Sequence, residues 1–399
     1  MELDLIRRLS QPADTKVILC VLDGLGGMPG PRGRTELEEA RTTNLDKLVA
    51  DGSIGRTLPV GFGITPGSGP GHMALFGYDP LVYEIGRGAL ESTGIGFEIG
   101  PDDMTARGNL CSLDTSGLIT DRRAGRLPTE QTEAICAQLQ TITLPGVQTF
   151  VQVVQDQRFI LVLRGSGLSD QIAETDPQRE GVPPIVCAAT APEGDHTAAL
   201  VREWVTKATA MLAGQERANG VLLRGWSGRP NVPPFPELWK LRAAAVTVYP
   251  MYRGVARLVG MDVVDGGHNL SEQIAAIRAH WDEYDFFFLH YKYTDSAGED
   301  GDFQRKSDAI EAFDQAVPDI LALGPDVLVV TGDHSTPATM AAHSFHSVPI
   351  VVWGKDVRRD HLSHFNEVAA REGELGQFPA KEVLPIAFGH AGRLAKFGA

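Results

Sequence analysis

The sequence predicts an α/β protein with a doubly wound, mostly parallel sheet and an inserted smaller α+β domain. Three observations predict this fold class. Short apolar runs end at acidic or glycine-rich loops, amphipathic segments alternate with these runs, and the middle of the chain follows a different pattern. Buried strands that alternate with amphipathic helices are typical of a parallel sheet covered on both faces.

Four segments have the pattern of buried strands in the main sheet: 16–27, 285–295, 326–337 and 348–354. Helical patterns lie between them, over 44–52, 271–284 and 303–323. In open α/β sheets, ligands bind beyond the carboxyl ends of the strands. Each of the first three strands is followed by a loop with an acidic residue, so we expect these loops to meet at one edge of the sheet.

The middle of the chain, 107–194, has the pattern of a small α+β domain inserted into the α/β core. "RGNLCSLD" reads as a strand, "TEQTEAICAQLQ" as a helix, and "VQTFVQVVQ" with "RFILVLRG" as a hairpin. The segment 187–197 contains Pro and Gly and is expected to be the linker back to the core. The predicted core is therefore 1–106 and 195–399.

Composition and charge restrict the function. The chain of 399 residues is long enough for two domains, and it has no apolar run typical of a signal peptide or a membrane span. Its 4 cysteines lack CxxC spacing, which indicates reduced thiols and a cytoplasmic protein. The formal net charge of −15 argues against nucleic acid or a membrane surface as a partner. A small anionic ligand would need a local group of arginines.

The stretch "TDSAGEDGDF", 294–303, directly follows one of the predicted buried strands. A solvated acidic turn is the ordinary interpretation of such a stretch, and the spacing of an EF-hand is absent. Asp295 and Glu299 would present their side chains to one metal ion if the turn is helical. Asp300 and Asp302 are expected to cap the following helix instead.

Further candidate metal ligands follow the other strands. Asp333 and His334 lie in "TGDHSTP", His343 follows in "AAHSFHSVP", and Asp23 ends the first strand. Helix capping is the alternative for such an acid, but carboxylates and imidazoles together suit a divalent transition metal. Carboxylates gathered at one sheet edge repel each other unless cations neutralise them. The sequence therefore predicts a metal site, provided that these loops converge.

The glycine-rich segment 63–80 contains Ser68 before a helical pattern. It matches neither the nucleophile elbow nor the P-loop. Two interpretations stay open for Ser68, an ordinary N-cap or a nucleophile that is activated by a metal ion. "GLGG" at 24–27 lacks the third glycine of a dinucleotide-binding fingerprint, so such a site is not expected.

Arginines beside glycines or at strand ends are candidates for binding an anion, because the guanidinium group matches phosphate and carboxylate. Ordinary surface charge is the alternative for each of them. "DRRAGR" places three arginines in five residues and indicates an anion-binding loop. The candidates are Arg87, Arg107, Arg122, Arg123, Arg126, Arg224 and Arg253. His72 and Lys292 lie next to the implicated loops and are candidates for phosphate contact or proton transfer.

Seven motifs carry a resemblance to a known family: "VLDGLGG", "ELEEARTTNLDKL", "PGSGPGH…LFGYDP…GRG", "DRRAGR", "ETDP", "TDSAGEDGDF" and "TGDHSTP…HS…VP". In this order, from about residue 16 to 354, they resemble the archaeal-type, cofactor-independent phosphoglycerate mutases of the alkaline phosphatase superfamily. The resemblance implies an alkaline-phosphatase-type core and a role in glycolysis and gluconeogenesis. It also implies two divalent metal ions, manganese first, with magnesium, cobalt or zinc as alternatives, and no 2,3-bisphosphoglycerate.

Carried over motif by motif, the resemblance implies one metal ion held by Asp23, Ser68, Asp333 and His334, and a second held by Asp295, Glu299 and His343. His346 is a neighbouring alternative to His343. The family's usual residue at position 299 is histidine, so Glu299 is a departure that leaves full activity open. Its oxygen ligand would favour manganese or magnesium over zinc.

The resemblance further implies that Ser68 takes the phosphoryl group from 3-phosphoglycerate and returns it to the 2-hydroxyl of the bound glycerate. The inserted domain would close as a lid that keeps water out. The partner is then a small phosphorylated carboxylic acid, and a homo-oligomer is left open. Two alternatives remain: a metal-dependent phosphatase or phosphonate hydrolase of the same superfamily, and a non-catalytic binding homologue.

Overall fold

The computed structural model describes residues 2–398, which divide into two compact units. The first unit comprises the chain up to Glu84 and from Val232 onward, and the second comprises Ile85–Asn231. The second unit is thus wider at both ends than the insert expected over 107–194. Each unit has a sheet and a core of its own.

The first unit is built on an eight-stranded sheet with the order β13-β2-β12-β11-β1-β10-β8-β9. The strands are β1 (Val17–Leu22), β2 (Ser53–Leu58), β8 (Ala243–Val246), β9 (Asp262–Val264), β10 (Phe286–Tyr291), β11 (Val327–Thr331), β12 (Val348–Gly354) and β13 (Gly376–Pro379). Only β12 runs antiparallel to its neighbours. A parallel neighbour of β11 would need a crossover, and the loop 332–347 that leads to β12 contains no helix. The mostly parallel α/β fold and its four predicted strands are confirmed.

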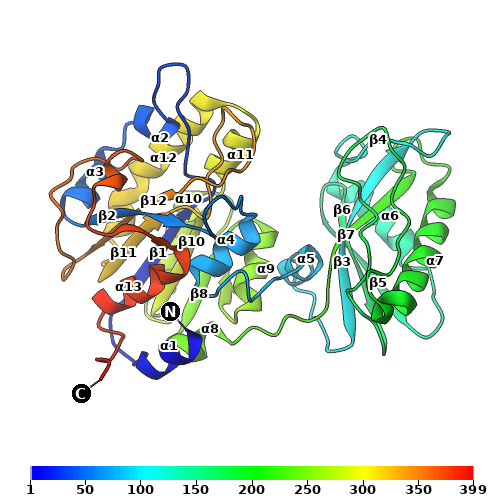
Figure 1. Ribbon diagram of the computed structural model, residues 1–399, viewed down its shortest axis with the longest axis horizontal. Helices are drawn as coiled ribbons and strands as arrows, with labels where there is room; N and C mark the ends of the chain where they lie inside the picture. Colours follow the sequence, from blue (N-terminus) through cyan, green and yellow to red (C-terminus); the bar gives the residue numbers. More distant parts are fainter. Residues whose placement is uncertain (1, 399) are drawn as a thin grey trace. The chain divides into compact units, whose positions relative to one another are not determined.

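Helices cover both faces of this sheet (Figure 1). They are α1 (Leu3–Leu9), α2 (Glu36–Glu39), α3 (Thr43–Ala50), α4 (Ser68–Leu75), α8 (Phe235–Trp239), α9 (Pro250–Leu258), α10 (Leu270–Ala279), α11 (Tyr293–Glu299), α12 (Phe303–Leu321) and α13 (Val383–His390), with 3₁₀ turns at Ala369–Arg371 and Ala380–Glu382. Side chains alternate between the faces of a strand. Phe287 accordingly stacks on Trp281 beyond α10, whereas Phe286 contacts Phe388 of α13.

The second unit is an α+β unit with a five-stranded sheet. Its strands are β3 (Asp103–Leu113), β4 (Ile119–Asp121), β5 (Gln148–Gln155), β6 (Arg158–Arg164) and β7 (Gly220–Ser227), and its helices are α5 (Arg87–Gly94), α6 (Thr129–Leu139) and α7 (Asp195–Leu212), with a 3₁₀ turn at Pro192–Gly194. The predicted hairpin is β5–β6. The segment 187–197 leads into α7 and is not the linker, because β7 follows it and pairs with β3. The chain leaves this unit only after Asn231.

The three predicted acid-bearing loops of the first unit leave the sheet side by side. β1 lies between β10 and β11 and is parallel to both, with Leu22 level with Tyr291 and Val21 level with Thr331. The residues that follow these positions therefore emerge at the same edge, as predicted from the sequence. No helix within residues 2–398 combines the length and apolarity that crossing a bilayer requires.

Candidate metal centre and active site

Ser68 is the first residue of α4, and Gly67 before it is the N-cap. Because Gly67 and not Ser68 occupies the N-cap position, the N-cap interpretation of Ser68 is wrong. Its hydroxyl is almost fully buried and lies 3.3 Å from Nε2 of His334. Gly71, one turn later, allows this approach, because a Cβ there would lie 2.5 Å from the carbonyl oxygen of Asp333. The serine therefore faces the loop that follows β11.

The first cluster of candidate metal ligands consists of Asp23, Asp333 and His334, all buried, with ligand atoms within 4.8 Å of one another. Nε2 of His334 lies 3.3 Å from Oδ1 of Asp23 and 3.2 Å from Oδ2 of Asp333. Thr336 donates its hydroxyl to Oδ1 of Asp295 at 2.6 Å and accepts from Nδ1 of His334 at 3.0 Å. This contact holds the proton on Nδ1, so that Nε2 presents a lone pair to the cluster.

The second cluster consists of Asp295, His334 and His343, so His334 belongs to both. Nδ1 of His343 donates to the carbonyl of Pro66 at 2.9 Å, which turns Nε2 toward Oδ1 of Asp295 at 3.6 Å. The turn after β10 is the helix α11, as the pairing of Asp295 with Glu299 requires. Glu299 lies outside both clusters, with a side chain that is 56% exposed and 3.7 Å from His343. Burial opposes protonation of His343, but the nearby carboxylate of Glu299 raises the pKa of His343 to about 9.

The residues of the two clusters fit a metal ion. Oδ1 of Asp23 and Oδ2 of Asp333 are buried and have no hydrogen-bond partner within the described chain. Burial and the charge of Asp23 raise the pKa of Asp295, so the positive charge nearby does not fully offset this one carboxylate. Carboxylate oxygens and imidazole nitrogens are donors that divalent transition metals accept.

Lys292 is the cation that contacts both clusters. Its ammonium lies 2.9 Å from Oδ2 of Asp23 and 2.5 Å from Oδ2 of Asp295. Burial opposes its charge, but these carboxylates hold the pKa of Lys292 above its ordinary value. Lys292, a candidate from the sequence, therefore lies at the site.

His72 also lies at the site, with Nδ1 2.8 Å from the carbonyl of Ser68 and 3.2 Å from Oδ2 of Asp333. Two further residues at the site, Tyr252 and His290, were not predicted from the sequence. The hydroxyl of Tyr252 donates to Asp23, and its ring stacks on His290 with centroids 3.6 Å apart. Burial lowers the pKa of His290 to about 4. A histidine inside "DFFFLHYKY" was a usable signal, whereas nothing in "YPMYRG" indicated the tyrosine.

The remaining acids of "TDSAGEDGDF" have structural contacts. Asp302 is the N-cap of α12 and accepts from the backbone N–H of Arg305 at 3.0 Å, as predicted. Asp300 is the C-cap of α11 and binds the guanidinium of Arg305 at 2.8 Å. The prediction that Asp300 caps α12 is therefore wrong.

In the second unit, two candidate arginines share one carboxylate, and a third lies beside them on the neighbouring strand. Arg87 and Arg107 each lie 3.8 Å from Oε1 of Glu91, and Arg224 is level with Arg107 on the neighbouring strand. Arg107 is buried. Burial lowers the pKa of Arg107 to about 9, although the charge of Glu91 opposes this; Arg87, Arg158 and Arg224 lower it further. Two guanidinium groups thus share one carboxylate, which favours an anion beside them, whereas Arg224 also lies 4.0 Å from Asp176.

The other candidate arginines are arranged differently. Arg122 binds Asp176 of "ETDP" through two hydrogen bonds, at 3.1 and 2.7 Å, whereas Arg123 and Arg126 are exposed. "DRRAGR" therefore supplies only part of the expected anion-binding loop. Arg253 lies in the first unit, on α9, and donates to the carbonyl of Thr247 at 3.0 Å.

Comparisons with known proteins agree on one family. The model of the 2,3-bisphosphoglycerate-independent phosphoglycerate mutases matches residues 50–217. Two relatives are named probable 2,3-bisphosphoglycerate-independent phosphoglycerate mutase. The one from Thermus thermophilus is 44% identical to this chain over 400 residues, and the one from Thermotoga neapolitana is 44% identical over 396 residues. Each alignment covers 99% of this chain and 98% of the relative.

Two solved structures are similar over most of the chain. A protein from Pyrococcus horikoshii is 30% identical with a TM-score of 0.84, and covers 96% of this chain and 99% of its own. The cofactor-independent phosphoglycerate mutase from Thermoplasma acidophilum is 31% identical with a TM-score of 0.68. Its alignment covers 94% of this chain and 100% of the solved chain. The chain therefore belongs to the 2,3-bisphosphoglycerate-independent phosphoglycerate mutase family.

Proposed function

We propose that this protein interconverts 3-phosphoglycerate and 2-phosphoglycerate through a phosphoserine at Ser68, in the cytoplasm. The observation that carries the proposal is the buried Ser68 hydroxyl, 3.3 Å from His334 and next to a group of carboxylates that fits metal ions. Relatives at 44% identity over nearly the full chain carry the name of this activity. A metal-dependent nucleophile of this kind needs no histidine base.

Two divalent metal ions, manganese in the first instance, complete the proposed site. Asp23, Ser68, Asp333 and His334 would hold one ion, and Asp295 and His343 the other; Glu299 would join them only if its exposed side chain turned toward the cluster. The position of His334 in both clusters supports ions that are close neighbours. When bound, the ions supply positive charge that offsets the phosphoryl oxygens and lowers the pKa of the serine hydroxyl.

The chain's own residues then perform two phosphoryl transfers. The Ser68 oxygen forms a bond to phosphorus while the bond from phosphorus to the substrate's 3-oxygen breaks, and the serine proton ends on that oxygen. The 2-hydroxyl oxygen of the glycerate next forms a bond to phosphorus while the bond from phosphorus to the Ser68 oxygen breaks. The proton of the 2-hydroxyl ends on the Ser68 oxygen, which restores the serine. Lys292 supports the proposal as a cation that faces both clusters during these transfers.

The substrate's carboxylate needs cationic partners as well. We assign this binding to the group formed by Arg87, Arg107 and Arg224, because Arg87 and Arg107 share the single carboxylate of Glu91 and Arg224 lies beside Arg107 on the neighbouring strand. Further proposed contacts are Arg122, Arg123, Arg126, Arg253 and His72. The second unit is also proposed to keep water from the phosphoserine, as a mutase requires.

The test is an assay with added manganese that measures 2-phosphoglycerate and released phosphate together. Ser68→Ala should lower turnover roughly 10⁴-fold or more, because the nucleophile is lost, while manganese binding is only weakened. Ser271→Ala, at an exposed serine on α10, is the matched control and should keep wild-type turnover. Mutase turnover that survives in Ser68→Ala would exclude the phosphoserine route. Phosphate release without 2-phosphoglycerate would make the protein a hydrolase instead.

A further inference from the structure

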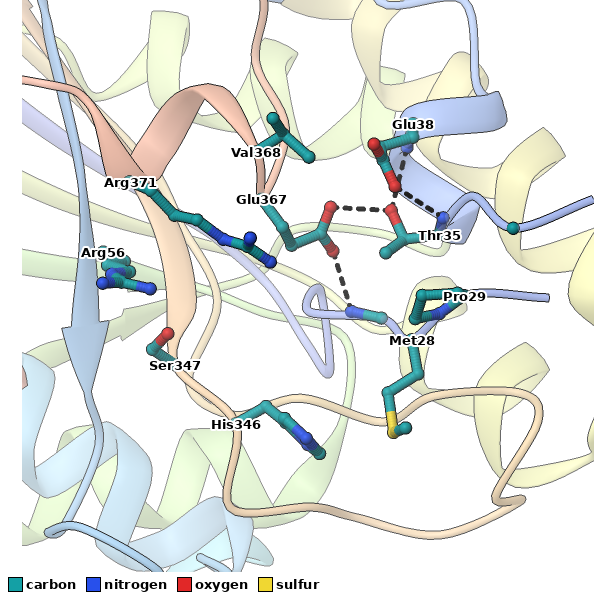
Figure 2. A pocket seen from close by; sticks show the side chains of 12 residues that line it. Met28, Pro29, Thr35, Glu38, Arg56, His346, Ser347, Glu367, Val368 and Arg371 are labelled. Atoms are coloured by element: carbon teal, nitrogen blue, oxygen red, sulfur yellow. Dashed lines mark hydrogen bonds between the residues drawn. The ribbon is translucent and has the colours of Figure 1, made fainter.

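A cavity of the first unit, of about 440 Å³, is lined by none of the residues of the two metal clusters and not by Ser68. Segments far apart in the sequence form its wall (Figure 2). They include the loop at Met28, the middle of β2 at Arg56, the loop at His346 and Ser347, and the turn that ends at Arg371. Small-molecule sites commonly have volumes of roughly 300–1,000 Å³.

The carboxylates of this cavity are already engaged by the protein. Glu367 accepts from the backbone N–H of Gly27 at 2.9 Å and from the hydroxyl of Thr35 at 2.7 Å. Glu38 accepts from the backbone N–H of Thr35 at 2.9 Å in a capping box at the start of α2. Figure 2 shows these contacts on one side of the cavity. Burial also raises the pKa of Glu367.

The arginines of this cavity are not engaged in the same way. Neither Arg56 nor Arg371 has a carboxylate within 4.0 Å anywhere in residues 2–398, and Nε of Arg56 is buried without a hydrogen-bond partner there. A buried N–H group that has lost water and gained no partner is costly. Nδ1 of His346 forms a hydrogen bond with the hydroxyl of Ser344 at 3.0 Å, so Nε2 of His346 remains for a ligand. In Figure 2, Arg56, Arg371 and Ser347 lie on the same side of the cavity.

We propose that this cavity binds a small organic anion whose phosphate or carboxylate group lies between Arg56 and Arg371. Guanidinium groups recognise both head groups through paired hydrogen bonds. The volume exceeds that of a head group alone, and Met28, Pro29 and Val368 provide an apolar wall for the organic part. This site is separate from the proposed active site and does not depend on the proposed function.

The test is calorimetric titration of the metal-free, full-length protein with glycerol 3-phosphate and, separately, with malonate. We expect one molecule bound per chain. Tighter binding of the first probe would assign the site to phosphate esters, and of the second to carboxylates. Arg56→Gln and Arg371→Gln should each weaken binding roughly tenfold or more, because each removes a charge-assisted contact. Arg371 is exposed, so its substitution should leave the fold intact even if Arg56→Gln perturbs β2.

Two controls separate this cavity from other anion sites. Arg278→Gln changes an exposed arginine of α10 that does not line the cavity and should bind as the wild type does. Arg107→Gln changes the arginine group of the second unit and should also leave this binding unchanged. Equal affinity in wild type, Arg56→Gln and Arg371→Gln would overturn the proposal. The proposal would also be overturned if neither glycerol 3-phosphate nor malonate bound up to roughly 10 mM.

Discussion

Lys306 offers a direct measurement of how the loops of the candidate centre are held. Its side chain is fully buried in α12 and donates to the carbonyl of Gly26 at 2.9 Å and to that of Thr336 at 2.8 Å. One of these carbonyls lies in the loop after Asp23 and the other in the loop after His334. Lys306→Met removes the ammonium and both hydrogen bonds while it keeps a side chain of similar length.

The magnitude follows from these two bonds and from the buried charge. A hydrogen bond to a charged group contributes about 1.5–3 kcal/mol, and loss of one member of a buried charged group costs about 3–5 kcal/mol. Burial lowers the pKa of Lys306, so removal of the ammonium also relieves part of its desolvation cost. We therefore expect the free energy of unfolding to fall by about 3 kcal/mol, which lowers Tm by roughly 4–6 °C for a unit or chain of this length.

Thermal unfolding followed by circular dichroism measures this change. Lys47→Met, at an exposed lysine of α3, is the matched control and should shift the free energy by about 0.5 kcal/mol or less. Glu36 is buried near Lys306 and contributes to its pKa, so Glu36→Gln in the Lys306→Met background should restore part of the loss. A fall no larger than that of Lys47→Met would refute the reasoning.

Two further outcomes are expected. Gly71→Ala should weaken both metal binding and turnover, because the added Cβ would lie 2.5 Å from the carbonyl oxygen of Asp333. The control is Gly389→Ala, whose added Cβ has no atom within 4 Å and which should resemble the wild type. Titration with manganese distinguishes the two variants. Asp103 is buried, but its contacts with Arg164 hold its pKa below the ordinary 3.8, so its stabilisation is present above that value and is lost as the pH falls through the lower, folded-state pKa. Unfolding midpoints measured below about pH 5 should therefore fall less steeply in Asp103→Asn, and an unchanged slope would contradict this.

Much of the first unit could be predicted because its strands are short apolar runs with polar ends. β1 is buried at all six positions, and such a strand is recognisable without its neighbours. The direction of β12 and the extent of the second unit could not be predicted in this way. β7 belongs to the second unit because it pairs with β3, more than a hundred residues earlier, and no local pattern specifies a partner at that distance.

The candidate site divides along the same line. Asp23, Asp295 and Asp333 could be predicted because they follow adjacent parallel strands, so the order of the sheet brings them together. Tyr252 and Lys306 reach the same region from helices that pack onto the sheet. Their contacts depend on how the helices pack, which a helical sequence pattern does not specify.

The departure at Glu299 can now be judged by geometry. The ligand atoms of Asp295, His334 and His343 gather within 4.8 Å without a contribution from position 299. Glu299 is half exposed and contacts His343 from outside the cluster, so its charge is partly solvated. A carboxylate at this position therefore changes the charge beside the second cluster and leaves three donors in place. Because Asp23 and Asp333 retain unpartnered oxygens in the first cluster, the demand for positive charge at the centre does not depend on residue 299.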